Sequence, residues 1–164
     1  NNIGFFYDSL GDKQQALKFL NEALLLSREV EDKNQEATTL NNIGLVYDSL
    51  GDKQQALERY NQALSLMREV EDKSGTARTL NNIGFIYSDL GDKQQALKRY
   101  NQALSLMREV KDKSGTARTL NNIGLVHYLL GDKQQALKLF NQALPLIREV
   151  GDKSGEAKIL SNIA

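Results

Sequence analysis

The sequence predicts an all-α protein made of antiparallel helical hairpins that stack as a repeat array. The first observation is a period: the stretch NNIGLVYDSLGDKQQAL at residues 41–57 returns with small changes from residues 1, 81 and 121, 40 residues apart each time. The second is that apolar and small residues within each copy recur at helical spacing. The third is the Gly-Asp pair between two such runs, which leaves room only for a tight turn. Repetition at a fixed period predicts stacked units without a single central core.

The first helix of a repeat is best seen in residues 75–90. Its apolar or small residues fall at positions 80, 83, 84, 87 and 90, which is one face of an α-helix rather than the alternation of a strand. Gly91 follows the last of them. Because a helix commonly ends with a left-handed glycine, we expect the first helix to stop there.

The second helix begins directly after that glycine. Asp92 is a good N-cap and Gln95 stands three positions later, as in a capping box. The apolar stripe then continues to Val110, so we expect the helix to run that far from Lys93. In the DKSG segment that follows, we expect Ser114 to cap the next first helix.

Small residues on the helix faces indicate close packing. Glycine recurs at positions 4, 44, 84 and 124 inside the first helix, where it costs about 1 kcal/mol relative to alanine. We therefore expect a helix backbone to pass too close to these glycines for any side chain. The aromatic residues at 60, 100 and 140 are expected to fill the wider space alongside, and Pro145 to kink the fourth second helix.

The repeats divide the chain into units of similar length. The expected units are residues 1–34, 35–74, 75–114, 115–154 and 155–164, all belonging to one array. The first and last are incomplete, so we expect a fragment of a longer protein. Open ends on nearly identical units also lead us to expect end-to-end self-association.

Composition excludes several classes of function. The 21 Lys and Arg residues balance 21 Asp and Glu residues, which argues against nucleic acid or a membrane surface as the main partner. Apolar runs are too short to span a bilayer. There is no cysteine, and His127 is the only histidine, so we expect no metal, no cofactor and no catalytic triad. We expect a cytoplasmic, non-enzymatic protein in which His127 is a packed ring.

The repeated residues resemble the tetratricopeptide repeat family. Copy two supplies the family's spaced positions, and copies three and four repeat them. The matching residues of copy two are Leu40, Ile43, Gly44, Tyr47, Ala56, Tyr60 and Ala63. Two features depart from the pattern: an arginine (Arg28, Arg68, Arg108, Arg148) replaces the closing proline, and the period is 40 residues rather than the usual 34. Longer repeats of this kind are similar to kinesin light chains and to bacterial scaffold and signalling arrays.

The resemblance implies a right-handed superhelix whose first helices line a concave, peptide-binding groove. Three rows of residues face that groove by helical angle. The apolar row is Phe5, Leu45, Phe85 and Leu125, with Tyr128 near its end. The amide row contains Asn41, Asn42, Asn81, Asn82, Asn121 and Asn122. The charged row contains Arg78, Arg118 and Lys158, with Asp48 and Asp89 one repeat earlier.

Each row also has a structural interpretation. The apolar row could pad the stack, the amides could bridge neighbouring helices instead of holding a peptide backbone, and the charges could pair between repeats rather than attract an acidic peptide. The leading hypothesis is a scaffold that binds a peptide or partner segment in the groove. The alternative is a structural spacer whose ends stack or exchange helices.

Overall fold

A computed structural model describes residues 12–164, and it confirms the all-α fold class. The chain divides into two compact units, residues 1–79 and 80–164, with helix α5 spanning the boundary between them. The described residues form helices and contain no strand. These helices are α2 (Lys13–Glu29), α3 (Lys33–Ser49), α4 (Lys53–Glu69), α5 (Lys73–Asp89), α6 (Lys93–Glu109), α7 (Lys113–Leu129), α8 (Lys133–Glu149) and α9 (Lys153–Ile163).

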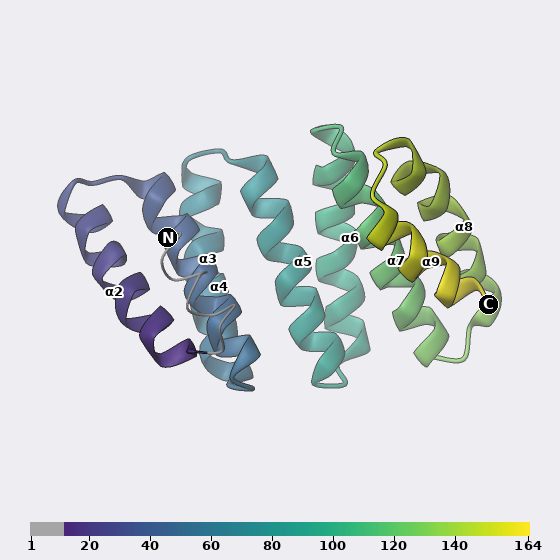
Figure 1. Cartoon of the computed structure of the whole chain (residues 1–164), viewed down its shortest axis with the longest axis horizontal. Helices are drawn as coiled ribbons and strands as arrows, with labels where there is room; N and C mark the ends of the chain where they lie inside the picture. Colours follow the sequence, from purple (N-terminus) through teal and green to yellow (C-terminus); the bar gives the residue numbers. More distant parts are fainter. Residues whose placement is uncertain (1–11) are drawn as a thin grey trace. The chain divides into compact units, whose positions relative to one another are not determined.

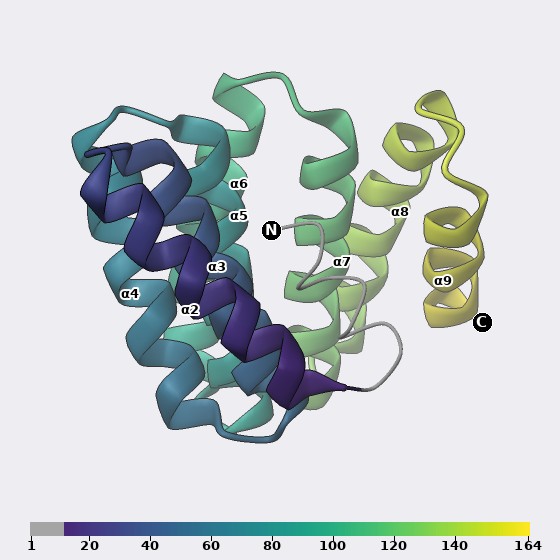
Figure 2. The ribbon, with the colours of Figure 1, turned by 60° about the vertical axis from the view of Figure 1, so that its left-hand side comes forward.

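Consecutive helices pack against one another within each unit. In the first unit, α3 packs along α4 and also contacts α2 (Figure 1). In the second unit, α7 packs along α8 and contacts α6, while α9 lies against α8 and touches α7 (Figure 2). The expected hairpin is therefore the pair formed by a first helix and the second helix that follows it.

An aspartate is the N-cap residue of helices α2–α4 and α6–α9. The carboxylates of Asp52, Asp92 and Asp132 each accept from the backbone N–H of the glutamine three positions later at 3.0 Å, as expected. The expectation for Ser114 is wrong. Asp112 is the cap of α7 and accepts from the N–H of Gly115 at 2.8 Å, so Ser114 already lies in the first turn.

Left-handed residues end the helices. Gly91 has a φ of +87°, and the glycines at 51 and 131 match it, so the predicted end of the first helix is confirmed. The second helices stop slightly earlier than expected, because Val110 is the C-cap of α6. The next residue is again left-handed, although it is a glutamate or a lysine in three copies: Glu31, Glu71 and Lys111 have φ values of 54°, 56° and 57°.

Among the described residues, an aromatic ring and not a helix backbone covers the recurrent glycines Gly44, Gly84 and Gly124. A Cβ placed on Gly84 would lie 2.8 Å from Cδ1 of Tyr100, and one on Gly124 would lie 2.5 Å from Cε1 of Phe140. The expectation of a close backbone is therefore wrong, because the ring itself occupies the space above the glycine. Pro145 lies inside α8, which keeps the same 17-residue length as α6.

Tyr60 offers a test of this packing. Its ring is fully buried over Gly44, its hydroxyl has no hydrogen-bond partner, and burial, with a smaller contribution from Asp48, raises its pKa. A buried polar group without a partner is destabilising. We expect Tyr60→Phe to raise the free energy of unfolding by about 1 kcal/mol. Urea denaturation measures this, and a loss of stability would show that the hydroxyl is satisfied in solution.

Candidate functional site

Asparagines on successive first helices form a hydrogen-bonded series in the second unit, which we call the amide ladder. Oδ1 of Asn81 accepts from the Thr119 hydroxyl at 3.3 Å and from Nδ2 of Asn122 at 3.2 Å. Oδ1 of Asn121 accepts from Nδ2 of Asn162 at 2.8 Å. The amide ladder thus joins α5 to α7 and α7 to α9 through carboxamide oxygens.

The first unit contains a related contact. Oδ1 of Asn41 accepts from the hydroxyl of Thr79 at 3.2 Å, and Asn42 is buried. In both units, therefore, these asparagines take part in holding neighbouring first helices together. The hydrogen bonds of Asn81 and Asn121 to the neighbouring helices use the carboxamide oxygen, which leaves the NH₂ group of each as a donor on the same surface.

A pocket of about 400 Å³ lies beside the amide ladder in the second unit. Asn81, Asn121 and Asn122 form one part of its wall. Ile147 and Ile159 also line it, although both side chains are almost wholly buried. A pocket with an apolar floor and a few polar groups has the character of a ligand site.

Charged groups give this groove pocket a positive bias. Arg118 and Lys158 line it and are exposed, whereas Asp152 is the acidic residue of the lining. The carboxylate of Asp152 accepts from the N–H of Gly155 at 2.9 Å, and Arg118 donates to Oγ of Ser114 at 2.7 Å. The bond to Ser114 uses only part of the donor capacity of the Arg118 guanidinium.

Other predicted residues lie on the same helices but outside the pocket lining. Phe85 and Leu125 are 49% and 37% exposed, each one helical turn from an asparagine of the amide ladder. Tyr128 is 53% exposed. Asn82 is half-buried and Asp89 is exposed, both on α5.

The first unit brings together fewer of the predicted residues. Leu45 is half-buried and Arg78 is exposed. Asp48 pairs with Lys53 at 2.5 Å, across the tight turn of its own hairpin, so the expected pairing of Asp48 with the next repeat is corrected. Phe5 lies outside the described residues.

His127 is less enclosed than the sequence suggested. Its side chain is 24% exposed, and Nδ1 lies 3.7 Å from a carboxylate oxygen of Asp132. Within residues 12–164 no three His, Cys, Asp or Glu side chains gather as a metal site would require. None of the helices in that part of the chain is long and apolar enough to cross a membrane.

Sequence reasoning missed the apolar floor of the groove pocket. Ile147 lies on the apolar stripe of its helix and was expected only as core, whereas Ile159 corresponds to position 79, outside the expected apolar face. Lys158 was placed in the charged row, but nothing in the sequence joined it to Asp152. The meeting of Ile147 with Ile159 depends on how α8 packs against α9, which sequence spacing does not contain.

The comparisons with known proteins now identify the family. The model of the tetratricopeptide repeat matches residues 1–69 and 75–149, so the chain belongs to this family. No curated protein matches it in sequence.

Solved structures show the same fold. BtubC (BKLC) from P. vanneervenii is 23% identical with a TM-score of 0.80, and the match covers 92% of this chain and 62% of that one. Kinesin light chain-like repeats of Podosopora anserina are 12% identical with a TM-score of 0.79, over 99% and 80% of the two chains. Aspartyl phosphate phosphatase F from Bacillus subtilis is 16% identical with a TM-score of 0.91, over 96% and 42%. The chain thus spans less than two thirds of BtubC and of the phosphatase.

The amide ladder gives a direct prediction about stability. Asn81→Ala removes the acceptor of the Thr119 hydroxyl, which is 1% exposed, and also that of Asn122. We expect a loss of about 1–2 kcal/mol in the free energy of unfolding, because a buried hydroxyl is left without a partner. Asn101→Ala, on an exposed position of α6, is the matched control and should change little. Equal effects of the two substitutions in urea denaturation would contradict a structural role for Asn81.

Proposed function

We propose that the chain is a protein-interaction module that holds a segment of a partner protein along the amide ladder of its second unit. The observation that supports this most strongly is the groove pocket, where ladder amides, two cations and apolar isoleucines line one volume. Membership of the tetratricopeptide repeat family supports it as well.

The chemistry of the groove pocket suggests how a segment is held. The NH₂ groups of Asn81 and Asn121 donate to backbone carbonyls, which fixes an extended peptide without reading its side chains. Arg118 and Lys158 select for a carboxylate nearby. An apolar side chain of the partner over Ile147 and Ile159 contributes about 2 kcal/mol.

The remaining groove residues extend this surface. Phe85 and Leu125 lie one helical turn along α5 and α7 from the ladder asparagines, and Tyr128 continues α7. We include Asn82 and Asp89 on α5. The first unit, taken by itself, has corresponding residues in Leu45, Asp48 and Arg78. The module acts without catalysis, in the cytoplasm, and with a protein rather than nucleic acid or a membrane as its partner; the balanced charge supports the last point.

A peptide-display selection against the immobilised chain tests this function. The double variant Arg118→Ala/Lys158→Ala should bind the selected peptides about tenfold more weakly than the unmodified chain does, because a charge-assisted contact is removed. Lys98→Ala/Lys138→Ala removes two exposed cations from the same unit outside the pocket lining and should bind normally. Selected peptides that bind both double variants equally well would reject the groove pocket as the site.

Self-association is a second candidate function, favoured by exposed apolar residues on α2. Leu25, Leu26 and Val30 are 60%, 61% and 71% exposed. An exposed apolar patch of this kind commonly marks an interface. We expect the mass measured by light scattering to rise with protein concentration, and Leu25→Glu/Leu26→Glu to abolish the rise. A constant monomeric mass would remove this candidate and would support a purely partner-binding module.

A further inference from the structure

A second pocket, of about 590 Å³, lies on the opposite side of α7 from the groove pocket. On α7 it is lined by Lys113, Thr116 and Leu120, whereas the groove pocket uses residues 118, 121 and 122. At 100° per residue these two sets point in opposite directions from the helix axis. The second pocket is therefore independent of the amide ladder, and we call it the outer pocket.

The outer pocket combines an apolar floor with a cationic rim. Pro145 and Leu146 contribute the accessible apolar surface, and the buried Leu120 also lines the pocket. Arg108 and Lys111 line the pocket with Lys113, and no carboxylate is part of the lining. Lys113 pairs with Glu149, but both side chains of that pair are about half exposed, so the pair holds Lys113 only weakly.

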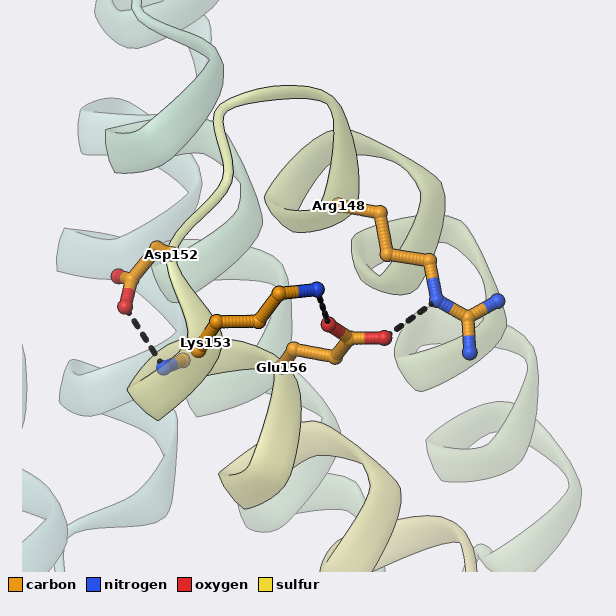
Figure 3. Close-up of polar contacts among 5 residues, drawn as sticks. Arg148, Asp152, Lys153 and Glu156 are labelled. Carbon is orange, nitrogen blue, oxygen red and sulfur yellow. Dashed lines mark hydrogen bonds and ion pairs between the residues drawn. The ribbon is translucent and has the colours of Figure 1, made fainter.

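The counterparts of Arg108 in two other repeats, Arg28 and Arg148, show what an arginine at this repeat position binds. Nε of Arg28 donates to Oε1 of Glu36 at 2.7 Å, and Nε of Arg148 donates to Oε1 of Glu156 at 2.7 Å. Figure 3 shows that Lys153 reaches the other oxygen of Glu156, at 3.0 Å, so this carboxylate lies between two cations. The hydrogen bonds from Arg148 and then Lys153 hold the pKa of Glu156 below its usual value.

The outer pocket has the same cations without the carboxylate. Arg108 and Lys113 stand 40 positions before Arg148 and Lys153, and Thr116 stands where Glu156 would be. The Thr116 hydroxyl donates to the backbone carbonyl of Asp112 at 2.7 Å, so it does not replace the missing acid. Lys111 adds a further cation at a position that is glutamate in two earlier copies, Glu31 and Glu71.

We propose that the outer pocket binds an acidic segment of a protein partner. One carboxylate of that segment lies between Arg108 and Lys113, and a neighbouring apolar side chain covers Pro145 and Leu146. The occupant is a peptide because the two internal examples are glutamate side chains carried on a backbone that packs beside the arginine. The positive rim and apolar floor match a segment with both properties. Because the outer pocket and the groove pocket lie on opposite faces of α7, the unit holds two partners at once.

Amide NMR titration of the full chain tests this proposal with a designed probe. The probe is acetyl-Gly-Glu-Leu-Phe-Asp-Gly-amide, and its control replaces Glu and Asp with Gln and Asn. We expect the acidic peptide to shift resonances at residues 108–116 and 142–146, and the neutral control to bind about tenfold more weakly. Shifts confined to the groove pocket, or equal binding of both peptides, would overturn the proposal.

Substitutions at the site sharpen the result. Thr116→Glu supplies the carboxylate that the chain has at Glu36 and Glu156, so it should occupy Arg108 and weaken the acidic peptide about tenfold or more while the chain stays folded. Thr116→Val is the matched control and should keep the affinity. Lys111→Glu reverses one charge of the cationic rim and should also weaken binding of the acidic peptide. Glutamate is compatible with the left-handed backbone of this position, because Glu31 and Glu71 adopt it in earlier repeats.

Two outcomes decide against this occupant. Unchanged affinity of the acidic peptide for Thr116→Glu would show that its carboxylate does not lie at Arg108. If decanoate binds at residues 108–116 with the same dependence on Thr116 and the acidic peptide does not bind, the occupant is a free amphiphilic acid, and a protein segment is excluded. Failure of these experiments leaves the groove proposal intact, because its test uses Arg118 and Lys158.

Discussion

Tyr100→Ala is expected to lower the free energy of unfolding by about 3–5 kcal/mol, the range observed for removing a large buried ring. Tyr100 is 1% exposed and lies over Gly84, in a core that also includes Leu104, Ala117 and Leu120. Its removal leaves a cavity between α5, α6 and α7 that the packed neighbours cannot fill. Urea denaturation followed by circular dichroism measures the change.

An exposed aromatic residue of the same unit gives the control for Tyr100→Ala. Tyr128 is 53% exposed, so Tyr128→Ala should change the stability by less than about 0.5 kcal/mol. A loss of under 1 kcal/mol for Tyr100→Ala would mean that the ring does not carry the packing of the unit.

Gly84→Ala should be almost as damaging, although alanine is the better helix former. The added Cβ would lie 2.8 Å and 2.9 Å from Cδ1 and Cε1 of Tyr100, whose rigid ring is buried and cannot turn aside. We expect a loss of about 3 kcal/mol, at the upper end of the range for an overpacked core.

A double-mutant cycle separates this clash from a simple change in helix propensity. In the background of Tyr100→Leu, Gly84→Ala should no longer cost stability and should recover up to about 1 kcal/mol, because the clash is gone and alanine favours the helix. An equal cost of Gly84→Ala in both backgrounds would show that the glycine is needed for another reason.

The parts of the fold set by local chemistry could be predicted from the sequence. Asp92 with Gln95, and the glycine at 91, mark a helix start and a helix end through bonds to their own neighbours. The Ser114 error arose because Asp112 and Ser114 are both good caps. Which of them caps the helix depends on where the chain leaves the preceding turn, and that turn includes the left-handed Lys111.

Contacts between helices were harder to predict. The spacing of small residues shows where another part of the chain comes close, but not whether that part is a helix backbone or a side chain. Gly84 marked a close approach correctly, but the neighbour is the ring of Tyr100. The asparagine rows were marked as groove-facing without a choice between binding and bridging. The structure shows bridging by the oxygens of Asn81 and Asn121 and by the NH₂ groups of Asn122 and Asn162. The proposed function therefore uses only the NH₂ groups of Asn81 and Asn121 as donors.

The outer pocket depends on a difference between repeats that is visible in the sequence but whose meaning the spacing of residues did not reveal. Comparison of copies shows threonine at 116 and glutamate at 156, which reads as an ordinary surface difference. Only the bonds from Arg148 and Lys153 to Glu156 show that the substitution removes the acid from a cationic site (Figure 3).

The side-chain NH₂ resonances of Asn81 and Asn121, recorded in ¹⁵N-labelled protein, test the central proposal most directly. On addition of a display-selected peptide, these resonances should shift and saturate together with the backbone amides of residues 154–159, because the ladder asparagines donate to the peptide while their oxygens stay bonded to Asn122 and Asn162. A peptide that binds tightly and leaves both NH₂ resonances unmoved would contradict the proposed role of the amide ladder in binding.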